Sequence, residues 1–317
     1  MPIPVSKFSK YRFITNLLAS LTTGYIFFYF SEIIFWARPR PEDSLSNWLQ
    51  TWLAYSLMAY VFLVVMRYFR AQTFPAIFLC GALFGWLAEG VVVQTTYESL
   101  PLSISFTGLA WHALITTGAG WYTLQRVVRR GWRPALRAGL LLGLFLWFWG
   151  ITWIYEEPAT AVSTGVFQVY TLISTILLMI SLTLIPIILI RPFQPTRAGV
   201  IVIVGLFVLY FAFIAVPAVP IALAILPVLM LIVLLSLRRN RLQEAEADSL
   251  LWLAQPVALS NVLPLVLAPL LASVLYWLTR ISGLALPTNW VVYLICTPAG
   301  FVLLGWSLWK IWRKRNN

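Results

Sequence analysis

Long apolar runs alternate with short polar segments along nearly the whole chain. Each run is about 20 residues long, enough for a helix to cross the hydrocarbon core of a bilayer. The pattern predicts ten spans, at residues 13–36, 48–68, 74–95, 104–125, 138–155, 163–190, 198–216, 221–237, 262–279 and 290–309. We therefore predict an all-α fold: a polytopic transmembrane helix bundle that forms one integral-membrane domain over residues 1–317.

The basic residues predict the orientation of these spans. With both termini in the cytoplasm, only Arg38, Arg40 and Arg280 of the 22 Lys and Arg residues lie on the outer side. This asymmetry follows the positive-inside rule and predicts a multi-pass protein of a prokaryotic cytoplasmic (inner) membrane. The first apolar run is too long for a signal peptide and lacks a small-residue cleavage site, so it is predicted to be the first span.

Composition excludes several other classes of protein. The chain is 61% hydrophobic and 10% charged, which excludes a soluble domain. Its net charge of +12 is carried by short loops between the spans, so we expect no nucleic-acid partner. Cys80 and Cys296 lie in separate apolar runs and predict no disulfide. A single histidine excludes a bis-histidine haem and a His-rich zinc centre, and neither a cofactor nor a metal is predicted.

Glu89 and the only histidine, His112, are the centre of the predicted functional site. Gly81, Gly85 and Glu89 recur every four residues, so the carboxyl shares a stripe with two glycines that permit close helix contact. His112 and Thr116 belong to a polar stripe on the next span. We expect both ionisable side chains to face the protein interior and to be partners. Because such groups are costly inside a membrane, a catalytic role is predicted for both.

A polar pocket near the outer leaflet is predicted around this pair, built from spans one, three, four, five and six. At 1.5 Å per residue, Glu32 and Gln168 lie at the same depth as the pair, roughly 6–12 Å below the outer surface. Tyr97 and Glu98, at the outer turn, are placed to contact a substrate head group. The predicted substrate contacts are Glu32, Tyr97, Glu98, Trp111, Thr116, Gln168 and Thr171.

The remaining segments carry fewer polar signals. Trp147, Trp149, Trp153 and Tyr155 of span five either line a cavity for a flat or polyunsaturated ligand or form an interfacial aromatic belt. Spans seven to ten are apolar and rich in proline, which we expect to shape packing. Residues 238–261 are predicted to form a cytoplasmic loop with a helix lying on the membrane surface, because mixed charges precede an apolar run.

One short segment resembles a known family over about thirty residues. The Glu, Gly, Tyr, Pro and Trp pattern of the membrane-embedded carotenoid-biosynthesis hydratases is similar to the order Glu89, Gly90, Tyr97, Pro101, Ile104 and Trp111. The resemblance implies that Glu89 protonates an isoprenoid double bond and that a polyene lies against span five. His112 and the spans after the fifth have no counterpart in it. In span number and placement of the termini, the chain is also similar to the drug/metabolite transporter superfamily.

Several functions fit these residues. The preferred hypothesis is a membrane-embedded enzyme acting on a lipidic or isoprenoid substrate, with Glu89 and His112 as acid and base. A Ser–His hydrolase using Ser99, Ser103 or Ser105 is an alternative, as is a metal held by the pair and a further glutamate. The same residues also fit a proton-coupled secondary transporter of a small molecule, a structural or assembly subunit, or a hydrogen bond that only locks two spans together. The sequence identifies no protein partner.

Overall fold

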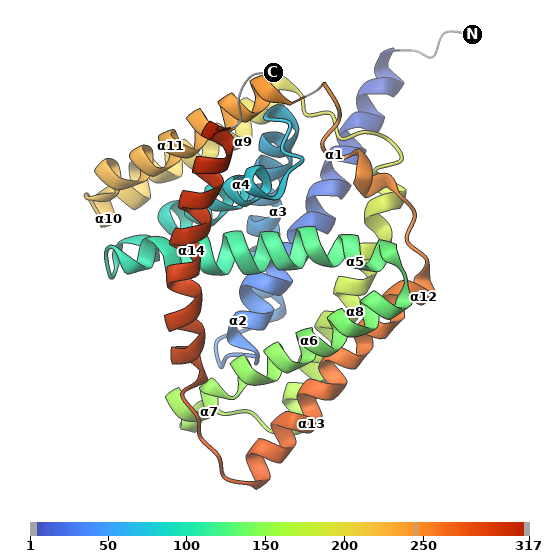
Figure 1. Ribbon diagram of the computed structural model, residues 1–317, viewed down its shortest axis with the longest axis vertical. Coiled ribbons are helices and arrows are strands. Elements are labelled where there is room, and N and C mark those ends of the chain that lie inside the picture. Colours follow the sequence, from blue (N-terminus) through green and yellow to red (C-terminus); the bar gives the residue numbers. More distant parts are fainter. Residues whose placement is uncertain (1–4, 245, 314–317) are drawn as a thin grey trace.

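The computed structural model describes residues 5–244 and 246–313, with residues 5–10 described by their backbone alone. All regular secondary structure in these residues is helical, and the helices pack as one bundle (Figure 1). Nine helices in the described part of the chain are long and apolar enough to cross a membrane. The predicted all-α polytopic bundle is confirmed.

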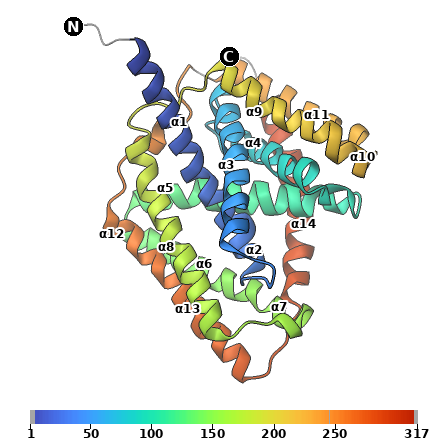
Figure 2. The same cartoon turned by 180° about the vertical axis from the view of Figure 1, so that it is seen from behind.

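Several spans are made of consecutive helical segments. The first half of the chain contains α1 (Val5–Phe28), η1 (Tyr29–Ile33), α2 (Ile34–Trp36), α3 (Leu45–Tyr68), α4 (Phe74–Trp86), η2 (Leu87–Val92), η3 (Thr95–Tyr97), η4 (Ile104–Thr123), α5 (Leu124–Arg130), α6 (Trp132–Gly150) and α7 (Thr152–Glu156). The second half contains η5 (Pro158–Thr160), α8 (Thr164–Ile188), α9 (Arg197–Tyr210), η6 (Phe211–Ala215), α10 (Val216–Ala218), α11 (Ala222–Gln243), η7 (Leu251–Ala254), α12 (Leu259–Val262), η8 (Leu263–Val266), α13 (Leu267–Ile281) and α14 (Thr288–Arg313). The start of α1 and the end of α14 lie at the same end of the molecule (Figures 1 and 2).

The predicted span at 104–125 corresponds to η4, which continues without a break into α5. η4 is wound more widely than an α-helix, because the amide of Leu124 donates to the carbonyl of Ala119, five residues earlier instead of four. In Figure 1 this helix runs across the middle of the bundle, and it contacts α1, α4 and α14. The residues in the middle of η4 therefore lie in the protein interior.

Glycine residues allow α4 to pack directly on η4. A Cβ added at Gly81 would lie 2.9 Å from Cβ of Thr117, and one added at Gly85 would lie 2.9 Å from Cβ of His112. The close contact predicted from these two glycines is therefore present. Similar small-residue packing joins α6 to η8 and α13, and α6 and α13 lie side by side in both views of the bundle.

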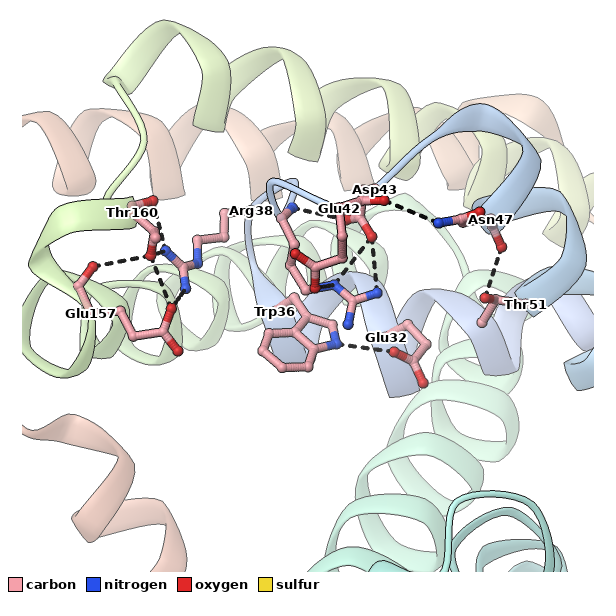
Figure 3. Close-up of polar contacts among 10 residues, drawn as sticks. Glu32, Trp36, Arg38, Glu42, Asp43, Asn47, Thr51, Glu157 and Thr160 are labelled. Carbon is pink, nitrogen blue, oxygen red and sulfur yellow. Dashed lines mark hydrogen bonds and ion pairs between the residues drawn. The ribbon is translucent and has the colours of Figure 1, made fainter. Parts of the chain in front are cut away.

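Two arginines order the loop that follows α2 (Figure 3). Arg38 is buried and donates to Oε2 of Glu157 at 2.6 Å and to the carbonyl oxygen of Thr160 at 2.7 Å. Arg40 donates to Oδ1 of Asp43 at 2.9 Å. The first of these arginines therefore ties the α2–α3 loop to the connection between α7 and α8.

Replacing Glu157 with glutamine is expected to lower the free energy of unfolding by about 1 kcal/mol at neutral pH, because buried Arg38 loses its charged partner. Hydrogen bonds from Arg38 and Thr160 lower the pKa of Glu157. A lowered folded-state pKa stabilises the fold fully above the unfolded pKa of about 4.3, and this contribution is lost as pH falls through the folded value. Thermal unfolding in detergent should therefore be measured between about pH 3 and 7. As the pH falls, the melting temperature should decrease less for the variant than for the parent.

A matched control for this measurement is Glu98→Gln, which removes an exposed carboxyl of a neighbouring loop. Its unfolding profile should follow that of the parent. Parallel profiles for the parent and Glu157→Gln across the whole pH range would contradict the stabilising role assigned to the Arg38 contact.

The segment 238–261 differs from its prediction. No long surface helix is present in its described residues: α11 extends to Gln243, and only η7 and the start of α12 follow. Leu250 and Leu253 are buried, and Trp252 packs 5.7 Å from the ring of Trp121 on η4. Leu250, Trp252 and Leu253 therefore pack on the end of the bundle, while Leu251 between them is exposed.

Candidate functional site

Three segments with wide, i→i+5 hydrogen bonding meet in the bundle: η1, η2 and η4. In each, the amide that follows the segment donates to a carbonyl five residues earlier. Turns of this kind are rare and are frequently found at functional sites. η1 carries Ser31 and Glu32, η2 carries Glu89, and η4 carries His112 and Thr116. The predicted acid, the predicted base, Ser31, Glu32 and Thr116 thus all lie on widened turns.

Glu89 and His112 are in direct contact. Nε2 of His112 and Oε1 of Glu89 are 2.7 Å apart, and Thr95 Oγ1 donates to Oε2 of the same carboxyl. On the other side of the ring, Nδ1 lies 2.9 Å from the Ser31 hydroxyl, which lies 2.9 Å from Oγ1 of Thr116. An ionised Glu89 only accepts, so Nε2 is then the donor and the neutral Nδ1 accepts from Ser31. One continuous chain of polar contacts therefore runs from Thr116 to Thr95.

The members of this chain differ in exposure. The His112 side chain is 3% exposed, Thr116 is fully buried, and the Glu89 side chain is 13% exposed. Phe84 packs edge-on against the imidazole, with 5.2 Å between ring centroids. The carboxyl is therefore the member through which a ligand at the edge of the site would reach the chain.

A second carboxyl, that of Glu32, lies in the same region. Tyr55 donates to its Oε1 at 2.8 Å and Trp36 Nε1 donates to its Oε2 at 3.1 Å, the latter drawn in Figure 3. The ring of Tyr55 lies 6.3 Å from that of His112, so both carboxyls border the same imidazole. Among the side chains that the structure describes, in residues 11–244 and 246–313, no Lys or Arg forms an ion pair with Glu32 or Glu89. Neutral donors and the imidazole therefore hold both carboxyls.

Other predicted substrate contacts lie near the pair but are directed elsewhere. Trp111 is buried, donates to a carbonyl of η1 and packs on Trp149 of α6, with ring centroids 4.7 Å apart. The hydroxyl of Tyr97 donates to the carbonyl oxygen of Gly90 at 2.9 Å, and Glu98 is exposed. The first two side chains therefore brace the turns that carry the site.

The prediction that Gln168 faces the pocket is wrong, because its side chain is exposed. Thr171 is buried as expected, yet it donates to the carbonyl oxygen of Phe167 in its own helix at 2.8 Å. The buried face of α8 begins with Phe167, Tyr170, Thr171, Ser174 and Thr175. Gln168 lies one position past the first member of this face, and about 100° of helical rotation turns it outward.

Three residues of the site were not predicted from the sequence: Ser31, Tyr55 and Thr95. Hydroxyl groups are common in membrane helices, where they bond to their own backbone, so their presence alone indicates nothing. Ser31 directly precedes Glu32, which is the one sequence signal for it. Tyr55 carries no comparable signal, because its partner Glu32 lies on another helix. Thr95 lies only six residues after its partner Glu89, but in the turn that follows the span.

The enzymatic hypotheses can be compared with this geometry. Ser103 donates to the carbonyl oxygen of Thr96 and Ser105 to that of Thr297, so the serine at the imidazole is Ser31. Over the described part of the chain, no group of three or more His, Cys, Asp or Glu side chains is arranged to hold a metal ion. The polar groups that do converge are suited to moving protons.

No known protein family, curated protein or solved structure matches this chain.

Proposed function

We propose that this protein is a membrane-embedded enzyme that acts on a lipidic or isoprenoid substrate, with Glu89 as the acid and His112 as the base. The observation that carries the proposal is the chain of contacts from Thr116 through Ser31 and His112 to Glu89. Its buried end holds the imidazole in one orientation, and its other end presents a carboxyl at the edge of the site. Enzymes that transfer protons commonly use an acid and a base positioned in this way.

The proposed chemistry needs only the groups at the site and one proton. Glu89 donates its proton to a carbon of a substrate double bond, which leaves a cationic carbon in the substrate. The Glu89 carboxylate then takes a proton from the neighbouring carbon, or from a water molecule that attacks the cation, and passes it to Nε2 of His112, which acts as the base. The 2.7 Å contact between the two side chains returns that proton to Glu89, so the pair ends in its starting state.

A lipidic substrate is favoured by the surroundings of the pair. The rings of Phe84 and Tyr55 pack near the imidazole, and Glu32 and Glu89 lie on helices long and apolar enough to cross a membrane. By the positive-inside rule we place it towards the outer leaflet of a prokaryotic inner membrane, with both termini in the cytoplasm. A substrate dissolved in the bilayer would reach Glu89 from the side without crossing water.

The chain of contacts from Thr116 through Ser31 and His112 to Glu89 also favours a second candidate, a proton-coupled carrier in which Glu89 alternates between protonation states. Carriers expose their central site to each side of the membrane in turn. A cysteine in place of the buried Thr116 would then react with a water-soluble thiol reagent from both faces. Labelling from one face only would count against the carrier and leave the enzyme as the better assignment.

The direct experiment is mass spectrometry of small molecules extracted from gently purified protein, comparing the parent with Glu89→Gln and His112→Ala. We expect one lipid, quinone or polyene to accompany the parent and to be reduced or chemically different in the variants. If no such molecule is retained and both variants restore the full lipid and pigment profile of a strain lacking the gene, the enzymatic proposal fails.

A further inference from the structure

A hollow lies apart from the Glu89 site, where α7 lies beside the start of α14 at the end of the bundle opposite the termini (Figure 1). It is a cavity of about 490 Å³, within the usual range for a small-molecule site. Six aromatic side chains line it: Phe35, Phe106, Trp149, Trp153, Trp290 and Tyr293. Two of the span-five tryptophans therefore face a cavity, while Trp147 donates to Thr279 on α13.

Only one charged residue lines this cavity, and it is acidic. Glu156 accepts from Nδ2 of Asn289 at 2.8 Å and forms no ion pair among the described residues. The neighbouring Glu157, by contrast, is paired with Arg38. Oδ1 of Asn289 is buried and has no hydrogen-bond partner in the described structure. The hollow thus combines a carboxylate that forms no ion pair among the described residues, a buried acceptor and a wall of aromatic rings. One of these rings, that of Trp153, already has the Arg38 guanidinium 4.9 Å from its centroid.

Together, these features favour a positively charged ligand. Aromatic faces attract cations through the ring quadrupole, and quaternary ammonium groups in particular are recognised by cages of such rings. A carboxylate at the rim strengthens the preference for positive charge and disfavours anions. The large apolar wall in turn favours a cation that carries hydrocarbon groups over a small hydrated one.

We propose that this cavity binds a lipophilic organic cation, a quaternary ammonium or phosphonium with aromatic or alkyl substituents, and that Glu156 is its counter-charge. Phe35 is the wall nearest the first site, since its ring packs at 4.9 Å on Trp111. Trp153 stacks at 5.1 Å on Trp36, the residue that donates to Glu32. The two sites are therefore separate but joined through packed rings.

The test is a titration of the purified full-length protein in dodecyl maltoside, followed by tryptophan fluorescence. The probes are tetraphenylphosphonium and the uncharged triphenylphosphine oxide. We expect saturable quenching with the phosphonium and an affinity at least about tenfold higher than for the uncharged probe. Glu156→Gln keeps the acceptor for Asn289 while removing the charge, and it should weaken phosphonium binding about tenfold or more.

Glu42→Gln is the matched control, because it removes an exposed carboxyl from the α2–α3 loop without touching the cavity. It should bind both probes as the parent does. Equal affinity for the charged and uncharged probes would overturn the proposal and indicate a neutral aromatic or polyene ligand. Absence of saturable quenching would overturn it as well. The comparison of the two probes is made on the parent, so it holds even where Glu156→Gln fails to fold.

Discussion

Glutamine in place of Glu89 is expected to reduce turnover of the proposed lipidic substrate by a factor of about 10²–10⁴, the usual contribution of a positioned acid or base. Glutamine has the shape of glutamate, and its Oε1 can still accept from Nε2 of His112. The fold is therefore retained while the exchangeable carboxyl proton is lost. The measurement is the amount of product, and of deuterium within it, in a strain lacking the gene that is complemented with each variant and grown in heavy water.

Glu42→Gln makes the same chemical change at an exposed position and should behave as the parent. The double variant Glu89→Gln with His112→Gln tests whether the two residues act together in catalysis. Residues that act as one unit are not additive, so the double variant should be little worse than either single one. Full activity in Glu89→Gln, together with loss of thermal stability in His112→Gln, would instead identify a hydrogen bond that only clamps η2 to η4.

Alanine at Gly85 is expected to be the most disruptive small substitution in the bundle. Its Cβ would meet the carbonyl of Gly108 and lie 2.9 Å from Cβ of His112, both on η4. Backbone atoms cannot rotate away, so α4 and η4 must separate, at a cost of about 1–3 kcal/mol. Thermal unfolding in detergent should show this loss, and activity should fall further because the shift acts directly on the imidazole.

Gly205→Ala supplies the control for that experiment. Nothing lies within 4 Å of a Cβ added at Gly205, and the residue is in the middle of α9. Alanine favours a helix over glycine by about 1 kcal/mol, so this variant should be as stable as the parent or slightly more stable. Equal stability of the two alanine variants would refute the assignment of close α4–η4 packing.

The sequence predicted those parts of the molecule that depend on strong local signals. Span positions follow from apolar length, and ionisable residues are so rare in such spans that Glu89 and His112 stand out at once. The close packing at Gly81 and Gly85 of α4 could also be predicted, because a spacing of four residues places both glycines on one face of a helix. These predictions required no knowledge of which helices are neighbours.

The remaining features depend on information that the sequence does not display. Ser31 and Tyr55 became site residues only when α1 and α3 were placed beside η4. Gln168 was assigned to the wrong face because a spacing of four residues was followed along α8 without the neighbouring helices that fix its phase. The apolar side chains around Trp252 were assigned to the membrane although the end of the bundle was available to them.

The widened turn at η2 also predicts how homologous chains of different length will differ. A π-turn holds one residue more than an α-turn, so deleting a single residue from Leu87–Val92 would restore a regular helix. The helix on either side would keep its phase, because an α-turn covers about the same rotation with one residue fewer, but the side chains within the turn itself would point in new directions. Glu89 would then no longer meet His112. Homologous chains one residue shorter in this segment are therefore expected to share the architecture and to lack the activity, which makes segment length a marker for separating the two groups.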